Sequence, residues 1–67
     1  MKINKLKLET IMAEKGFQIK DLSEKTGIHE ATISKIKNGI QKPRPITIGK
    51  IAKGLEVYIT ELIEQEN

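Results

Sequence analysis

The chain has 67 residues, a length that suits one domain with a modest hydrophobic core. It contains no cysteine, which excludes disulfides and thiolate metal sites as supports for so small a fold. The net charge of +3 is unevenly distributed, because residues 31–55 contain bases and no acid whereas residues 56–67 contain glutamates and no base. A cationic middle segment is typical of nucleic-acid binding, and an uneven solvated surface is the alternative. The basic residues of that segment are Lys35, Lys37, Lys42, Arg44, Lys50 and Lys53.

The N-terminus is basic, but no continuous apolar run follows it as in a signal peptide. No segment is long enough and apolar enough to span a bilayer, so no membrane association is expected. Together with the absence of cysteine, these features agree with a reducing cytoplasm, and we expect a cytoplasmic protein.

The first predicted helix spans residues 5–15. Its apolar positions follow the helical spacing, and Gly16 comes directly after it as a stop signal. We expect one continuous apolar face on this helix. Its members are Ile3, Leu6, Leu8, Ile11 and Met12.

Two short helices joined by a tight turn are predicted between residues 18 and 38. The first spans residues 19–26 and the second residues 30–37. Gly27 permits the sharp turn because glycine adopts positive φ without steric cost. This is the helix-turn-helix pattern, in which the second helix typically enters the DNA major groove. The apolar positions that would hold the two helices together are Leu22, Ile28, Ile33 and Ile36.

The rest of the chain is predicted to form a loop and two further helices. The loop over residues 40–45 contains both prolines, and Pro45 suits the first position of a helix, where its missing N–H is not needed. The fourth helix is expected over about residues 46–54 and the fifth over about residues 59–66. No segment shows the alternation of a strand, so the predicted class is all-α, with five helices in a single domain over residues 1–67. The core residues expected from the last two helices are Ile48, Ile51, Ala52, Leu55 and Leu62.

Three segments of the chain resemble the phage Cro and lambda-repressor-like (XRE) helix-turn-helix domains. They are LSEKTGI, TISKIKNG and KPRPITIGKIAKGLEV, and the similarity extends from Leu8 to Leu62. The resemblance implies a compact lambda-repressor-like fold. It also implies a small DNA-binding regulator of the cytoplasm, commonly a dimer on a palindromic operator.

The same resemblance implies which residues contact DNA. The start of the third helix reads bases in this family, which maps onto Glu30, Ala31, Thr32 and Lys35. The asparagine after that helix and the basic loop beyond it hold phosphates, which maps onto Asn38, Lys42 and Arg44. Lys37 and His29 are further phosphate candidates. For each residue the alternative is an ordinary exposed side chain, and for Glu30 it is a favourable interaction with the helix dipole alone.

Several positions depart from the family pattern. Ile19 replaces a glutamine that often holds a phosphate, and His29 replaces the usual Ser or Thr cap of the third helix. An arginine late in the first helix often pairs with a glutamate before the Asn-Gly, and these positions hold Met12 and Lys37 here. Both members of the ion pair are absent together, which is consistent with a stable fold because losing only one would leave a charge without its partner. We therefore expect Lys37 to face solvent or DNA.

The sequence predicts a homodimer. One helix reads only a few base pairs, so useful specificity generally requires two half-sites about 34 Å apart. Tyr58, Ile59 and Ile63 are the candidate dimer interface, with completion of the core as the alternative.

The function that fits these features is a sequence-specific DNA-binding transcriptional regulator, a repressor that binds a palindromic operator as a dimer. The alternative is an antitoxin-type interaction module that neutralises a protein partner and also binds DNA, with the acidic C-terminal helix as its partner surface. An enzyme is not expected, because one histidine, no cysteine and no phosphate-cradling glycine loop leave no catalytic constellation. No metal or other cofactor is expected either.

Overall fold

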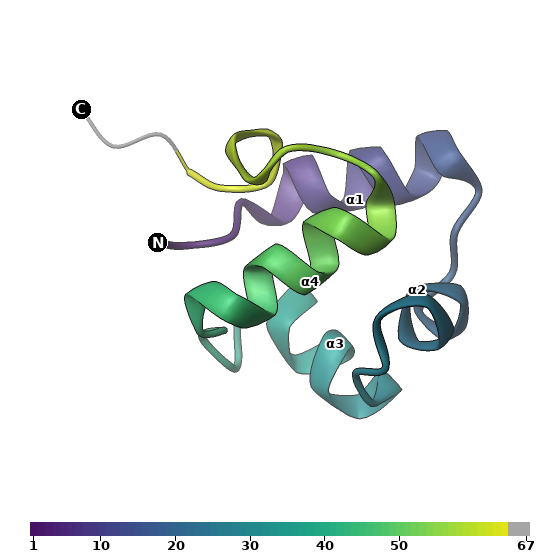
Figure 1. The fold of residues 1–67 in the computed structure, drawn as a ribbon. Coiled ribbons are helices and arrows are strands. Elements are labelled where there is room, and N and C mark those ends of the chain that lie inside the picture. Colours follow the sequence, from purple (N-terminus) through teal and green to yellow (C-terminus); the bar gives the residue numbers. More distant parts are fainter. Residues whose placement is uncertain (65–67) are drawn as a thin grey trace.

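The computed structural model describes residues 1–64 and consists of helices joined by short turns (Figure 1). The elements are α1 (Lys5–Lys15), α2 (Ile19–Thr26), α3 (Glu30–Lys37), α4 (Pro45–Leu55) and a 3-10 turn, η1 (Ile59–Glu61). The predicted all-α class is confirmed, and the first three helices have the predicted bounds. Within residues 1–64, no helix has the length and apolar character needed to cross a membrane.

Local backbone chemistry explains why the helices begin and end where they do. The Asn4 side chain caps the start of α1 by accepting the N–H of Lys7 at 3.0 Å. Pro45 is the first residue of α4, a position that suits proline. The helix extends one residue beyond the predicted range of 46–54 at each end. Three helices end with a backbone bond from the second or third residue beyond the helix to a carbonyl five positions earlier. These bonds run from Phe17 to Met12 (2.8 Å), Ile40 to Lys35 (2.8 Å) and Val57 to Ala52 (3.0 Å).

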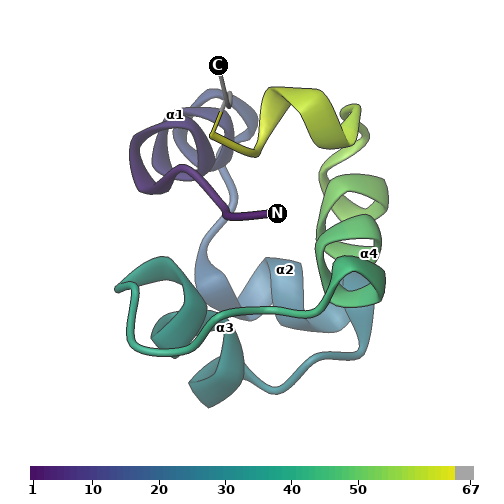
Figure 2. The same ribbon diagram turned by 90° about the vertical axis from the view of Figure 1, so that its left-hand side faces the viewer.

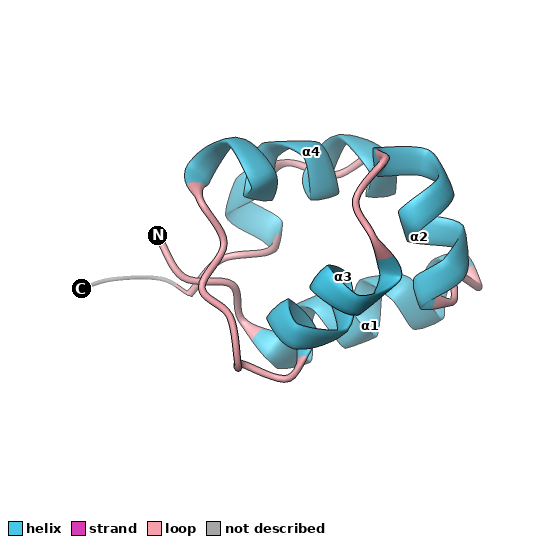
Figure 3. Ribbon diagram, turned by 90° about the horizontal axis from the view of Figure 1, so that it is seen from below, coloured by secondary structure: helices cyan, strands magenta, loops and turns pink. Residues whose placement is uncertain are grey.

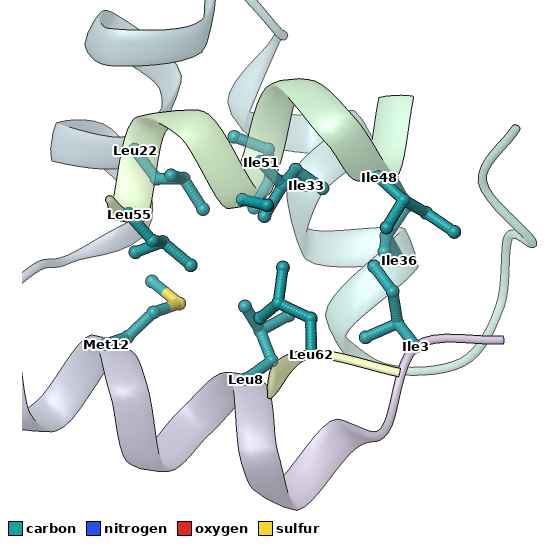
Figure 4. Close-up of a cluster of buried hydrophobic side chains, with 11 residues drawn as sticks. Ile3, Leu8, Met12, Leu22, Ile33, Ile36, Ile48, Ile51, Leu55 and Leu62 are labelled. Atoms are coloured by element: carbon teal, nitrogen blue, oxygen red, sulfur yellow. The ribbon is translucent and has the colours of Figure 1, made fainter. Parts of the chain in front are cut away.

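One hydrophobic core holds the helices together (Figure 4). The second helix, α2, packs against both α3 and α4, and α1 packs against the same two helices. The expected core positions of α2, α3 and α4 are buried, while Ile11 and Ile28 are partly buried against the cluster. The buried hydrophobic residues are Ile3, Leu8, Met12, Leu22, Ile33, Ile36, Ile48, Ile51, Ala52, Leu55 and Leu62.

The prediction that Leu6 extends the apolar face of α1 is wrong. Leu6 is 72% exposed, whereas Leu8 is fully buried. The two residues are two positions apart, which places them about 200° apart around a helix of 3.6 residues per turn. The core therefore receives Leu8 and Met12 from α1, and Ile3 enters it from the segment before the helix.

A single 3-10 turn replaces the helix predicted over residues 59–66. The last two residues of that predicted range lie outside the described residues. The backbone beyond η1 pairs with the start of the chain instead of continuing a helix. Asn4 donates its N–H to the carbonyl of Leu62 at 2.8 Å, and Glu64 donates its N–H to the carbonyl of Lys2 at 2.8 Å. These bonds form an isolated antiparallel bridge between Ile3 and Ile63. Leu62 is fully buried as predicted, but it follows a 3-10 turn instead of lying within a helix.

Candidate nucleic-acid interface

The turn between α2 and α3 is fixed by side-chain hydrogen bonds. The Thr26 hydroxyl donates to the carbonyl of Leu22 at 2.8 Å and accepts the N–H of Ile28 at 3.2 Å. The Ser23 hydroxyl donates to the carbonyl of Ile28 across the turn. Gly27 has a φ of 77°, which a residue with a side chain adopts only at a steric cost. These contacts orient α3 relative to α2, so the helix-turn-helix predicted from the sequence is present.

One face of α3 enters the core and the other faces outward. Ile33 is fully buried and Ile36 is 5% exposed. Ala31 and Lys35 are exposed on the outer face, and Thr32 is half-buried beside them. The helix lies along one outer edge of the molecule, at the bottom of Figure 1 and in the centre of Figure 3. The packing of two isoleucines thus presents a short row of polar and small side chains to a partner.

The N-terminus of α3 has no side-chain cap. His29 is the N-cap residue and is exposed, but its side chain makes no capping hydrogen bond. The first N–H groups of a helix carry a partial positive charge and attract anions. Glu30, in the first turn, is exposed and interacts favourably with the same dipole.

The segment that follows α3 presents its cations outward. Lys42 and Arg44 are exposed, whereas Pro43 between them is buried and anchors the loop to the protein. Figure 2 shows this loop crossing from the end of α3 to the start of α4. Asn38, the C-cap of α3, is also exposed, and its amide donates a long 3.5 Å hydrogen bond to the Ser34 hydroxyl. The three predicted phosphate contacts are therefore accessible side chains at one end of α3.

Lys37 occupies a different position from the other predicted phosphate contacts. It is half-buried and lines an open hollow formed by the end of α1, the start of α2 and the end of α3. Met12 and Ile19 line the same hollow. Three of the four positions that depart from the family pattern, Met12, Ile19 and Lys37, thus line one hollow at the start of α2.

Lys2 is a candidate contact that the sequence did not suggest. It lines a hollow with Gln41 and Lys42, about forty residues away along the chain. Its backbone carbonyl is held by Glu64, which fixes the segment next to the loop. No local pattern in the sequence links these residues, because Lys2 reaches the loop only through the packing of Ile3 with Ile36 in the core.

The predicted dimer residues are only partly brought together. Tyr58 is 81% exposed and, with the half-buried Ile59, lines an open and mainly apolar hollow beside α4. Ile63 is half-buried, bridges to Ile3, and accepts a hydrogen bond from the Lys7 ammonium at 3.1 Å through its carbonyl. Tyr58 and Ile59 therefore form an accessible apolar surface, although Ile59 and Ile63 also pack against the core.

Known proteins share this arrangement. A family model described as helix-turn-helix matches residues 8–62. The restriction-modification controller protein C.AhdI from Aeromonas hydrophila has a similar structure, with a TM-score of 0.81 and 19% identity over 85% of this chain and 86% of that one. The controller protein C.Esp1396I superposes with a TM-score of 0.76 and 26% identity over 92% of this chain and 90% of that one.

A search of the curated proteins found no match. The family model nevertheless spans the helix-turn-helix and the helices that support it. The chain belongs to the XRE-type helix-turn-helix family of DNA-binding transcriptional regulators.

Proposed function

We propose that this protein is a repressor that binds a palindromic operator as a dimer. The observation that carries the proposal is the outward face of α3, which lies next to a loop whose cations, Lys42 and Arg44, are exposed. A helix of this kind fits the major groove, and a basic loop beside it fits the flanking phosphates. The similarity to two restriction-modification controller proteins supports a regulatory role.

In this proposal the first turns of α3 read the bases. Lys35 is exposed and long enough to reach the O6 or N7 atom of a guanine. Thr32 donates to a base or packs against a thymine methyl, and Ala31 allows the helix to approach the groove closely. Glu30 accepts a hydrogen bond from a cytosine N4, which is the base group that suits a carboxylate.

Phosphates on either side of the groove are held by residues around α3. Asn38, Lys42 and Arg44 hold them beyond its C-terminal end. His29 donates a ring N–H to a phosphate at its N-terminal end. Lys37 supplies a cation near the start of α2, where Ile19 cannot bind a phosphate. Each contact of a cation with a phosphate adds a salt-dependent increment to affinity.

The dimer would form through the apolar surface around Tyr58 and Ile59, which lies beside α4 rather than on α3. A two-fold contact there leaves both copies of α3 free to enter successive major grooves on one side of the duplex. Such a dimer would repress a promoter by covering it.

Selection of bound sequences from a random duplex pool tests this function, with binding of the selected sequence then titrated against salt. The proposal predicts a palindrome with half-sites about one helical turn apart, or roughly 34 Å. The selected site should bind much more tightly than random DNA at physiological salt. Recovery of no motif, or of a motif without two-fold symmetry, would contradict the proposal and favour a role in binding a protein partner.

Replacing Lys35 by alanine should relax specificity at one base position in each half-site. The expected loss is about 1–3 kcal/mol on the selected operator, because a contact to a base edge disappears. Binding would be measured on the operator and on single-base variants of it. Lys15→Ala is the matched control, since it removes the same charge from an exposed position at the end of α1. Equal losses on operator and random DNA would refute the role of Lys35.

Replacing Lys42 by alanine should weaken binding to every sequence by a similar factor. The lysine neutralises a phosphate and carries no sequence information, so discrimination between operator and random DNA should stay unchanged. The slope of log affinity against log salt should become shallower by about 1. A salt titration of wild type and variant on both DNAs measures this. A changed base preference would place Lys42 in the groove instead.

A further inference from the structure

Asn38 and Gly39 form a dipeptide with distinctive chemistry. Asparagine followed by glycine deamidates more readily than other asparagines, because glycine has no side chain to hinder attack by its backbone nitrogen. Both residues are exposed at the end of α3, and Gly39 has a φ of 75°. Within residues 1–64, the Asn38 amide has only the long 3.5 Å bond to Ser34. Water and base therefore reach this pair freely.

We propose that Asn38 is a site of spontaneous deamidation, and that the protein loses affinity for DNA as this residue is converted. The Gly39 nitrogen loses its proton to a base in solution and attacks the side-chain carbonyl carbon of Asn38. A new C–N bond closes a succinimide ring, and the side-chain nitrogen leaves as ammonia. Water then opens the ring at either carbonyl and leaves aspartate or isoaspartate at position 38.

The turn at the end of α3 controls the rate of this reaction. The Gly39 N–H donates to the carbonyl of Ile36 at 3.1 Å, and the Ile40 N–H donates to that of Lys35 at 2.8 Å. Asn38 has backbone angles of φ −89° and ψ 4° in this closed turn. The bond to Ile36 must open before the nitrogen can attack. Opening exposes no buried side chain, because residues 38–40 are already exposed, and such segments open at low free-energy cost.

The same chain contains an internal control in Asn4. This residue precedes Lys5 rather than a glycine, and its side-chain oxygen accepts the Lys7 N–H at 3.0 Å as the cap of α1. The amide is therefore engaged and the following nitrogen is hindered by a side chain. Asn4 should keep its amide under conditions in which Asn38 loses it. The remaining asparagine, Asn67, lies outside the described residues.

The effect on DNA binding rests on the function proposed above, in which Asn38 contacts a phosphate. Deamidation replaces a hydrogen-bond donor with a carboxylate that repels the phosphate. Isoaspartate also adds an atom to the main chain and shifts the loop that carries Lys42 and Arg44. We expect affinity to fall by at least about tenfold, since juxtaposed like charges are strongly unfavourable. Bound operator should slow the reaction, because a phosphate contact holds the turn closed.

The experiment ages the purified protein in mildly alkaline buffer at physiological temperature, with and without operator DNA. Mass spectrometry of the peptide that contains Asn38 follows the conversion of amide to carboxyl, and the Asn4 peptide is followed in parallel. DNA binding and circular dichroism are measured at each time. Asn38→Gln is the matched control, since glutamine keeps the amide but cyclises much more slowly. Asn38→Asp supplies the expected product directly.

The proposal predicts conversion at Asn38 and not at Asn4, slower conversion on operator, and a loss of binding that tracks conversion while the helical signal persists. Aged Asn38→Gln should keep the affinity that it had when fresh. Persistence of the Asn38 amide in folded protein, while urea-unfolded protein converts, would overturn the proposal. Conversion without loss of affinity would overturn its functional half. If fresh protein selects no DNA, the proposed function fails, but the mass measurement still decides the modification.

Discussion

Replacing Leu62 by alanine is expected to lower the free energy of unfolding by about 2–5 kcal/mol. Leu62 is fully buried and comes from the last described segment of the chain, where its side chain lies beside Leu8, between α1 and α4 (Figure 4). A domain of this size has only about 0.05–0.15 kcal/mol of stability per residue. The loss should therefore be a large fraction of the total stability of the domain. Urea or thermal unfolding followed by circular dichroism measures the loss.

Leu6→Ala is the matched control for this substitution. It removes the same atoms from a leucine that is 72% exposed, so little apolar surface returns to water. The change should be within about 0.5 kcal/mol of zero, as for other surface substitutions. Equal destabilisation by the two variants would contradict the placement of Leu62 in the core and of Leu6 outside it.

Replacing Gly54 by alanine is expected to destabilise the protein by about 1–3 kcal/mol, although alanine is the better helix former. An added Cβ would lie 2.7 Å from the Thr26 Cγ2 atom and 3.4 Å from the Leu22 Cδ1 atom. Thr26 cannot easily turn away, because its hydroxyl bonds to Leu22 and Ile28 in the helix-turn-helix turn. The methyl group would push α4 away from the end of α2, so DNA affinity should fall as well.

Gly49→Ala is the comparison within the same helix. Its Cβ would meet only the Ile59 Cδ1 atom, at an ordinary contact distance of 3.9 Å. Stability should rise by up to about 1 kcal/mol, because alanine has the higher helix propensity. Denaturant unfolding of both variants at one protein concentration tests the pair. Stabilisation by Gly54→Ala would mean that α2 and α4 do not approach each other this closely.

Much of the helix-turn-helix could be predicted from the sequence because its signals are local. Apolar spacing places Ile33 and Ile36 on one side of α3, and Gly27 marks the turn before it. The outward row that includes Lys35 follows directly from that periodicity. The loop also carries a local signal, since two cations flank Pro43 in the sequence, and both are exposed in the structure. The expected accessibility of these candidate DNA contacts therefore needed no knowledge of distant parts of the chain.

Long-range contacts decided the features that the sequence did not predict. The backbone after η1 bonds to residues 2–4 and not to itself, so the fifth helix is replaced by a 3-10 turn and a bridge. The packing of Ile3 in the core likewise places Lys2 and Lys42 around the same hollow. The approach of Gly54 to Thr26 likewise depends on how α2 and α4 pack. Helical periodicity can be recognised in a short window of the sequence. Pairing between the two ends of a chain leaves no periodic signal, so only the tertiary structure determines that pairing.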